Sequence, residues 1–311
     1  MGMILSVSRR TDVPAFYSEW FLNRIREGYA CVRNPMSYHQ VSRMDIRPEV
    51  TDCIVFWTKN PAPMMSKLDE LKDYRYYFQF TLNPYGKNIE TAVARKNGII
   101  DVFKSLSDKI GPERVVWRYD PIFFTKEIDT DYHLLYFEKL SSMLKGYTQR
   151  CIISFLDLYK KTERNMSGTG AYAPDEATMR RIATDFSAIG KGINLEIQSC
   201  AETIDLDKHG VSHGHCVDRE LIEQIVGYHL EVKKDPNQRK ECGCVESIDI
   251  GEYNTCMHHC LYCYANFSQS QVIHKHESHH VDSPLIVGNL GADDNVKDRP
   301  VKLLKAYGLF D

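Results

Sequence analysis

Short apolar runs alternate with amphipathic helical patterns along most of the chain, and this alternation predicts βα units around a parallel sheet. The predicted strands cover residues 4–8, 53–58, 76–82, 114–119, 151–155 and 194–199, with a further short strand within 29–33. The predicted helices cover residues 14–27, 63–72, 89–109, 131–145, 174–190 and 218–227. Residues 34–49 have no clear period and are predicted to form a loop.

These elements give at least six βα units, and residues 245–250 supply a candidate seventh strand. This number favours a (β/α)6–8 barrel of the TIM type, partial or fully closed, over a doubly wound sheet. The dinucleotide fingerprint G-x-G-x-x-G is absent after every predicted strand. We therefore predict an α/β fold with one barrel domain over residues 1–281, which includes the cysteine-rich region 242–266. A C-terminal extension over residues 282–311 is predicted to pack on the barrel.

Composition narrows the class of protein. The chain has 311 residues, 43% of them hydrophobic, so it can bury a large core. A formal net charge of −3 gives no sign of a general polyanion-binding surface, and nucleic acid is not expected as a partner. No signal peptide or membrane-spanning segment is expected. Ten cysteines in such a chain favour reduced thiols and metal ligation, and the expected location is the cytoplasm.

Three cysteines near the C-terminus, Cys256, Cys260 and Cys263, form the pattern C-x3-C-x2-C. Electron-transfer iron–sulfur clusters are held by four cysteines, and no fourth lies at matching spacing. A three-cysteine cluster leaves one iron with an open position, and a catalytic cluster needs such a position to bind a ligand. The alternative is a structural zinc site completed by His258 or His259, but such sites usually combine two C-x2-C knuckles and this stretch has one. The spacing favours iron–sulfur.

This pattern, with an aromatic residue before its last cysteine, resembles the cluster loop of the radical S-adenosylmethionine superfamily. The chain also resembles an uncharacterised family, domain of unknown function 1848 (DUF1848), which is set apart by a C-terminal cysteine cluster of this type. The matching stretches are residues 6–15, 56–61, 242–244 and 249–266, so the resemblance spans nearly the whole chain. It supplies a cofactor class but no substrate.

The resemblance implies a 4Fe-4S cluster on the three cysteines, with its open iron chelated by the amino and carboxylate groups of S-adenosylmethionine. It implies that Tyr262 packs over the cluster and that Tyr264 lies near the adenine, and Asn266 of the same motif is assigned to the cofactor site. In the superfamily the cluster loop follows the first barrel strand. Here that strand would be residues 247–250 and the next helix residues 264–275, so we predict a circularly permuted barrel in which this strand lies beside residues 4–8.

Polar residues gather where the predicted strands end, and parallel barrels carry their functional residues at those ends. Arg9 and Arg118 lie near two such ends, and alternation places Glu196 and Gln198 on one face of a third strand. We predict that these four are catalytic residues that position S-adenosylmethionine and substrate, with Gln198 also in the cofactor site. The alternative is a set of barrel-mouth salt bridges of structural value only.

A second set of cysteines, Cys200, Cys216, Cys242 and Cys244, lies at a predicted strand end and in loops. Four thiols that converge on one rim could hold a second, fully ligated 4Fe-4S cluster, and the alternative is that some are free thiols. Three further cysteines lie in apolar strand contexts and are interpreted as core residues: Cys31, Cys53 and Cys151.

The sequence therefore predicts an enzyme that generates a 5′-deoxyadenosyl radical and abstracts hydrogen from an unidentified small-molecule or peptide substrate. A reductant such as flavodoxin or ferredoxin would supply the electron. One alternative is a nucleic-acid repair or modification protein built on the same cluster. Another is a non-catalytic iron–sulfur sensor.

Overall fold

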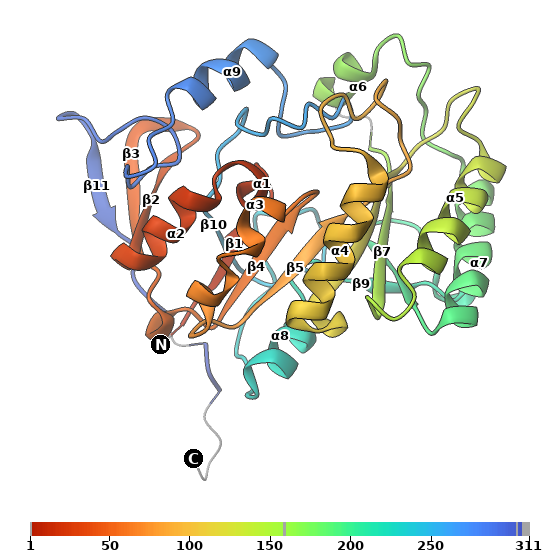
Figure 1. The fold of residues 1–311 in the computed structure, drawn as a ribbon, viewed down its shortest axis with the longest axis horizontal. Helices are drawn as coiled ribbons and strands as arrows, with labels where there is room; N and C mark the ends of the chain where they lie inside the picture. Colours follow the sequence, from red (N-terminus) through yellow and green to blue (C-terminus); the bar gives the residue numbers. More distant parts are fainter. Residues whose placement is uncertain (1, 158–159, 303, 307–311) are drawn as a thin grey trace.

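An eight-stranded, all-parallel sheet forms the centre of the computed structural model, which describes residues 2–157, 160–302 and 304–306 (Figure 1). The strands lie in the order β10 (Ile248–Asp249), β1 (Ile4–Val7), β4 (Cys53–Thr58), β5 (Tyr76–Thr81), β6 (Val115–Ile122), β7 (Arg150–Phe155), β8 (Glu196–Cys200) and β9 (Ser212–Gly214). The predicted α/β class with a parallel sheet is confirmed. Ile248 pairs with Leu5 in parallel, so the strand before the cysteine loop lies beside the N-terminal strand, as predicted.

The sheet is open. Among the described residues, β9 and β10 each pair with one neighbour and not with each other, so full closure of a barrel is not found. The predicted number of parallel strands, six to eight, is correct, but the two edge strands do not pair with each other. The chain that follows β8 packs instead on the face of the sheet that a closed barrel would enclose.

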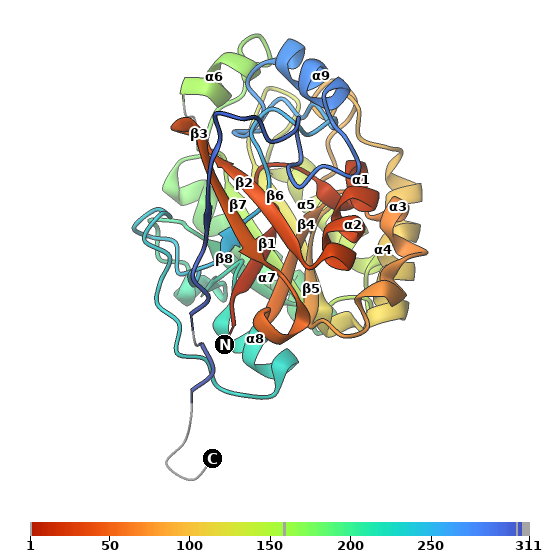
Figure 2. The same ribbon diagram turned by 90° about the vertical axis from the view of Figure 1, so that its left-hand side faces the viewer.

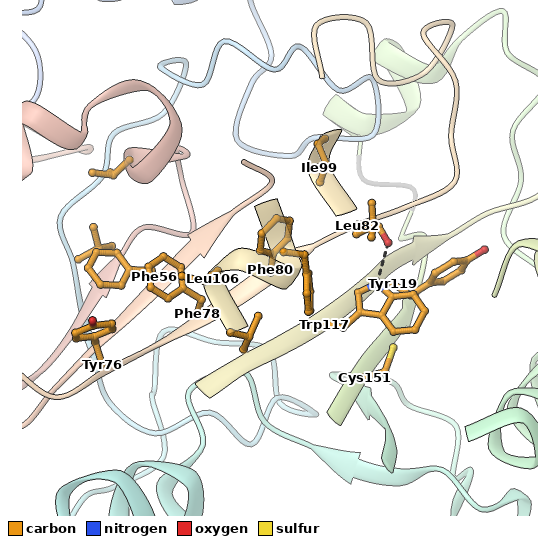
Figure 3. Packing of buried hydrophobic residues seen from close by; sticks show 14 of the residues in the cluster. Phe56, Tyr76, Phe78, Phe80, Leu82, Ile99, Leu106, Trp117, Tyr119 and Cys151 are labelled. Carbon is orange, nitrogen blue, oxygen red and sulfur yellow. Dashed lines mark hydrogen bonds between the residues drawn. The ribbon is translucent and has the colours of Figure 1, made fainter. Parts of the chain in front are cut away.

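Helices cover one face of the sheet, and irregular chain with one short helix covers the other (Figure 1). The helical face packs on α1 (Val13–Phe16), α2 (Ser18–Glu27), α3 (Ala62–Met65), α4 (Lys96–Ile110), α5 (Thr130–Met143) and α7 (Glu176–Ile193). Figure 3 shows this core, in which Phe56 stacks on Phe78; Phe80 packs on Phe103 of α4, and Phe56 packs on Phe21 of α2. The Trp117 indole donates a hydrogen bond to the Leu82 carbonyl at 2.9 Å. Alternate residues of the same strands form the other face, because successive side chains of a strand point to opposite sides.

This second face, here called the inner face, carries Ile4, Val55, Tyr77 and Val116 and packs against α8 (Arg219–Val226) and the chain around residues 230–245. Aspartates at N-cap positions fix where several helices begin, for example Asp218 at the start of α8. No described helix combines the length and apolar character that crossing a lipid bilayer requires.

A small second sheet lies at the edge of the molecule beside β1 and α2 and is formed by β2 (Tyr29–Asn34), β3 (Ser37–Asp45) and β11 (Asn295–Asp298) (Figure 2). The prediction that residues 34–49 form a loop is wrong, because β3 is a nine-residue strand. Its outward residues are polar and its alternation is weak, so its pairing with β2 and β11 decides its conformation. The extension after residue 281 contributes β11, and the backbone N–H of Cys31 donates to the Pro284 carbonyl at 2.8 Å. The extension therefore packs on the N-terminal part of the chain, and the boundary at 281 stays a prediction.

The helix predicted over 14–27 is divided into α1 and α2, the helix predicted over 63–72 is reduced to α3, and β9 was not predicted. Further differences lie in loops near the cysteine stretch. The helix predicted over 89–109 begins only at Lys96, and residues 83–95 form an irregular segment. The helix predicted over 264–275 is α9 (Gln269–Glu277). The structure adds α6 (Lys160–Met166), which the sequence did not indicate.

Candidate functional site

The loop that carries Cys256, Cys260 and Cys263, here called the cysteine loop, lies over the carboxyl ends of β1, β4 and β5. In parallel barrels this edge of the sheet carries the functional polar groups. Asp249, the last residue of β10, accepts hydrogen bonds from the hydroxyls of Ser6 and Ser8 at 3.0 and 2.6 Å and thereby joins the start of the loop to β1. Gly251 allows this approach, since a Cβ there would lie 1.9 Å from the Ser8 hydroxyl oxygen. The loop then pairs with the irregular segment after β5, where Leu261 N–H donates to the Ile89 carbonyl at 3.0 Å.

Cys256, Cys260 and Cys263 are brought to one side of this loop, with Cys260 buried and the other two partly exposed. Backbone groups beside two of the sulfurs lower the pKa of these thiols against the effect of burial: that of His258 at Cys256, and those of Ala265 and Asn266 at Cys263. Burial raises the pKa of the Cys260 thiol to about 12. No described group of three or more His, Cys, Asp or Glu side chains is arranged around a single ion-sized space. A four-iron cluster does not require such convergence, because each cysteine binds a different iron.

A buried charge network lies beneath the loop. The Glu90 carboxylate, 1% exposed, accepts hydrogen bonds from Lys59 at 2.8 Å, from Lys96 and from the Tyr262 hydroxyl. Burial alone would raise the pKa of Glu90, but the two ammonium groups outweigh burial and lower it to about 2. Tyr262 also accepts a hydrogen bond from the Asn83 amide at 3.1 Å. The aromatic residue before the last cysteine is therefore held by two polar groups of the irregular segment 83–95, and one of them, Glu90, is paired with Lys59 and Lys96.

A second connection holds the middle of the loop. The Asp12 carboxylate lies 2.8 Å from His258 Nε2, accepts the backbone N–H of Lys59 at 2.6 Å, and caps α1 through Ala15 N–H. The other ring nitrogen of His258, Nδ1, is buried and has no hydrogen-bond partner. A histidine bound to a carboxylate through one nitrogen, with the other nitrogen unpaired, is oriented like a metal ligand.

The predicted catalytic arginines lie together, but at the second set of cysteines. The guanidinium groups of Arg9 and Arg118 lie over the Trp57 ring, 5.3 and 5.1 Å from its centroid. Arg118 donates a hydrogen bond to the Cys216 sulfur and another to Asp120. These contacts place both guanidinium groups on the inner face of the sheet.

The four cysteines predicted as a second set converge there. The sulfurs of Cys200 and Cys216 are 3.1 Å apart, and both Cys242 and Cys244 hydrogen bond with Cys200. Hydrogen bonds from the other three thiols hold the pKa of the Cys244 thiol well below its usual range. All four are buried.

The other residues predicted for the site lie in different parts of the structure. Asn266 donates to the Cys256 carbonyl, and its buried Oδ1 has no partner. Tyr264 is half exposed and donates from its hydroxyl to the Arg9 carbonyl at 2.8 Å. Gln198 lies on the inner face and donates to Glu196 at 2.8 Å, as alternation predicts.

Glu196 is not grouped with the other predicted site residues. It is the first residue of β8, its side chain is 52% exposed, and it lies 3.7 Å from Arg150 at the start of β7. That is the amino-terminal edge of the sheet, whereas parallel sheets bind ligands at the carboxyl edge. The same-face prediction is correct, but Glu196 lies at the other end of the strand.

Sequence reasoning did not single out Glu90, Lys96 or Asp249. Glu90 lay within a predicted helix, and a surface helix would expose it.

A family model described as Domain of unknown function (DUF1848) matches residues 4–265. The match includes every strand of the central sheet and the whole cysteine loop. No curated protein and no solved structure matches the chain.

Proposed function

The chain belongs to the DUF1848 family, and we propose that it is a radical S-adenosylmethionine enzyme whose 4Fe-4S cluster is held by Cys256, Cys260 and Cys263. The observation that carries the proposal is a loop with three cysteines at the carboxyl edge of a parallel sheet, in which the neighbouring backbone lowers the pKa of two of the thiols against burial. Backbone groups that favour the anionic form of sulfur favour metal binding and tune clusters.

The topology supports a permuted partial barrel. β10, the cysteine loop and α9 follow one another in the order that the superfamily resemblance implies for the start of its barrel, yet they come near the end of this chain. β10 lies at the sheet edge beside β1, so joining the two chain ends and cutting the chain between β9 and β10 would restore that order. Connections between adjacent elements can be exchanged in this way where chain ends lie at the surface.

The residues around the loop fit the cofactor. Two buried polar atoms, Asn266 Oδ1 and Thr11 Oγ1, lack protein partners, and the amino, carboxylate and hydroxyl groups of S-adenosylmethionine are hydrogen-bonding groups that suit them. Lys59 favours the thiolate form of Cys260, since its ammonium lowers the pKa of that thiol against the effect of burial. Tyr262 is fixed by its hydrogen bond to Glu90.

A 4Fe-4S cluster held by Cys256, Cys260 and Cys263 would supply the one-electron reduction of S-adenosylmethionine that allows a hydrogen atom to be taken from the substrate, with the electron drawn from a reductant of the flavodoxin or ferredoxin class. The protein's part is to hold the cysteines, orient the cofactor and exclude water and oxygen.

The test is the release of 5′-deoxyadenosine by anaerobically reconstituted protein that is given S-adenosylmethionine and dithionite. We expect release by the native chain, and none by Cys260→Ala. Cys31→Ala is the matched control, because Cys31 is equally buried but lies in the small sheet. If the native chain carries a reducible cluster and releases no 5′-deoxyadenosine, the proposal is wrong.

One observation favours a second candidate, a structural zinc site formed by the three cysteines and His258. The unpaired Nδ1 of His258 and its hydrogen bond to Asp12 are the arrangement expected of a zinc-bound histidine. Replacing His258 by Gln would then release the metal, whereas a three-cysteine cluster would remain bound. The nucleic-acid and sensor alternatives stay untested predictions.

A further inference from the structure

Four buried cysteines outside the cysteine loop meet on the inner face of the sheet. Cys200 ends β8, Cys216 follows β9, and Cys242 and Cys244 come from a loop more than twenty residues further along the chain. The Cys200 and Cys216 sulfurs are 3.1 Å apart, and Cys244 hydrogen bonds with each of the other three thiols. Three separate segments of the chain therefore bring these four cysteines together.

The surroundings of these sulfurs suit negative charge. The backbone N–H of Val217 donates to Cys244 Sγ at 3.3 Å, and the Arg118 guanidinium donates to Cys216 Sγ. Arg9 interacts electrostatically with Cys244 and Cys216. Arg9 also pairs with Asp235 at 3.5 Å and Arg118 with Asp120, so both guanidinium groups have a carboxylate partner as well as sulfur neighbours. Cationic neighbours and N–H donors favour the thiolate form in which cysteine binds a metal.

The spacing distinguishes a single ion from a second cluster. Zinc–sulfur bonds of about 2.3 Å place the sulfurs of a tetrahedral site about 3.8 Å apart. The Cys200 and Cys216 sulfurs, 3.1 Å apart, leave no ion-sized space between them, so an ion would separate this pair by several tenths of an ångström. A four-iron cluster would require much wider separation, because each cysteine binds a different iron.

We propose that Cys200, Cys216, Cys242 and Cys244 bind one tetrahedral metal ion, Zn²⁺ or Fe²⁺, in place of the second 4Fe-4S cluster that the sequence suggested. Four sulfur ligands leave no open position, so the ion is structural. It fastens the chain after β8 over the inner face, where the four cysteines pack among apolar residues from the strands and α8. Arg9 then lies between this ion and the cysteine loop, since its guanidinium interacts with Cys216 and Cys244 while its carbonyl accepts the Tyr264 hydroxyl.

The test uses full-length chain in which Cys256, Cys260 and Cys263 are replaced by Ala, so that the result does not depend on the proposed radical site. We expect about one zinc or iron ion per chain, and X-ray absorption with only sulfur neighbours near 2.3 Å. Adding Cys242→Ser should release the ion, whereas adding Cys53→Ser should not, because Cys53 is buried on the same face outside the four-sulfur group.

Three results would overturn the proposal: no bound metal after incubation with either ion, about four irons with sulfide per chain, or a Cys200–Cys216 disulfide in protein kept reduced. If the Cys242→Ser chain does not fold, the absorption spectrum of the triple-alanine chain still decides between one ion and a cluster. A chelator should also lower the thermal midpoint of that chain, because removing a structural ion removes its binding free energy from folding.

Discussion

Removing the negative charge of Glu90 should destabilise the protein far more than removing an exposed carboxylate. The change is Glu90→Gln, which keeps the shape but leaves the buried ammonium of Lys59 without its counter-charge. The fall of the Glu90 pKa from 4.5 to about 2 corresponds to about 3 kcal/mol of folding free energy at neutral pH. For a chain of 311 residues, an unfolding entropy of about 2 cal/mol/K per residue converts this loss to a fall of about 5 °C in the thermal midpoint.

The pH dependence of stability gives an independent measure of the contribution of the Glu90 charge. Because the folded pKa is depressed, the contribution is fully present above about pH 4.5 and is lost as the pH falls towards 2. The difference in stability between the native chain and Glu90→Gln, measured by denaturant unfolding from pH 6 to pH 3, should therefore shrink at the acid end. Glu70→Gln is the control, because Glu70 pairs with Arg26 at the surface and should contribute at most about 1 kcal/mol. If the two variants are equally stable at pH 6, the charge network is not a significant source of stability.

Two further substitutions test the close contacts around the two cysteine groups. Gly243→Ala would place a methyl group 2.0 Å from the His215 ring and should cost about 1–3 kcal/mol, whereas Gly192→Ala meets nothing within 4 Å and should be neutral or stabilising in thermal unfolding. Tyr17→Phe removes the hydroxyl that donates to the Thr255 carbonyl at 2.8 Å. It should cost about 1 kcal/mol and accelerate the loss of iron from the loop to a chelator, and an unchanged rate would show that this bond does not hold the loop.

The sequence was most informative where one strong local pattern decides the structure. Runs such as residues 53–58 and 76–81 become central strands because both of their faces are buried, so apolar content alone identifies them. The polar strand β3 is stable only through its partners β2 and β11, the second of which comes from about 250 residues later in the chain. A window of sequence contains no information on that pairing.

The candidate site likewise has parts that a local sequence pattern identifies and parts that only the folded chain brings together. The spacing of Cys256, Cys260 and Cys263 identifies the loop, and four further cysteines were correctly grouped because thiols in loops have few other roles in a reduced protein. The position of Arg118 was also predicted, but not the sulfur that it contacts. Glu90 was missed because its significance lies in two lysines and a tyrosine that surround it only after folding.

The central claim is that one iron of a cluster on the cysteine loop lacks a protein sulfur and binds S-adenosylmethionine. Mössbauer spectroscopy of the anaerobic, ⁵⁷Fe-reconstituted protein, with and without S-adenosylmethionine, tests it directly. The account predicts that the signal of a single iron of the cluster changes when S-adenosylmethionine is added, and that Cys260→Ala has no cluster signal. A cluster whose irons are all unaffected by S-adenosylmethionine, or a loop that binds zinc through His258 and no iron, would contradict it.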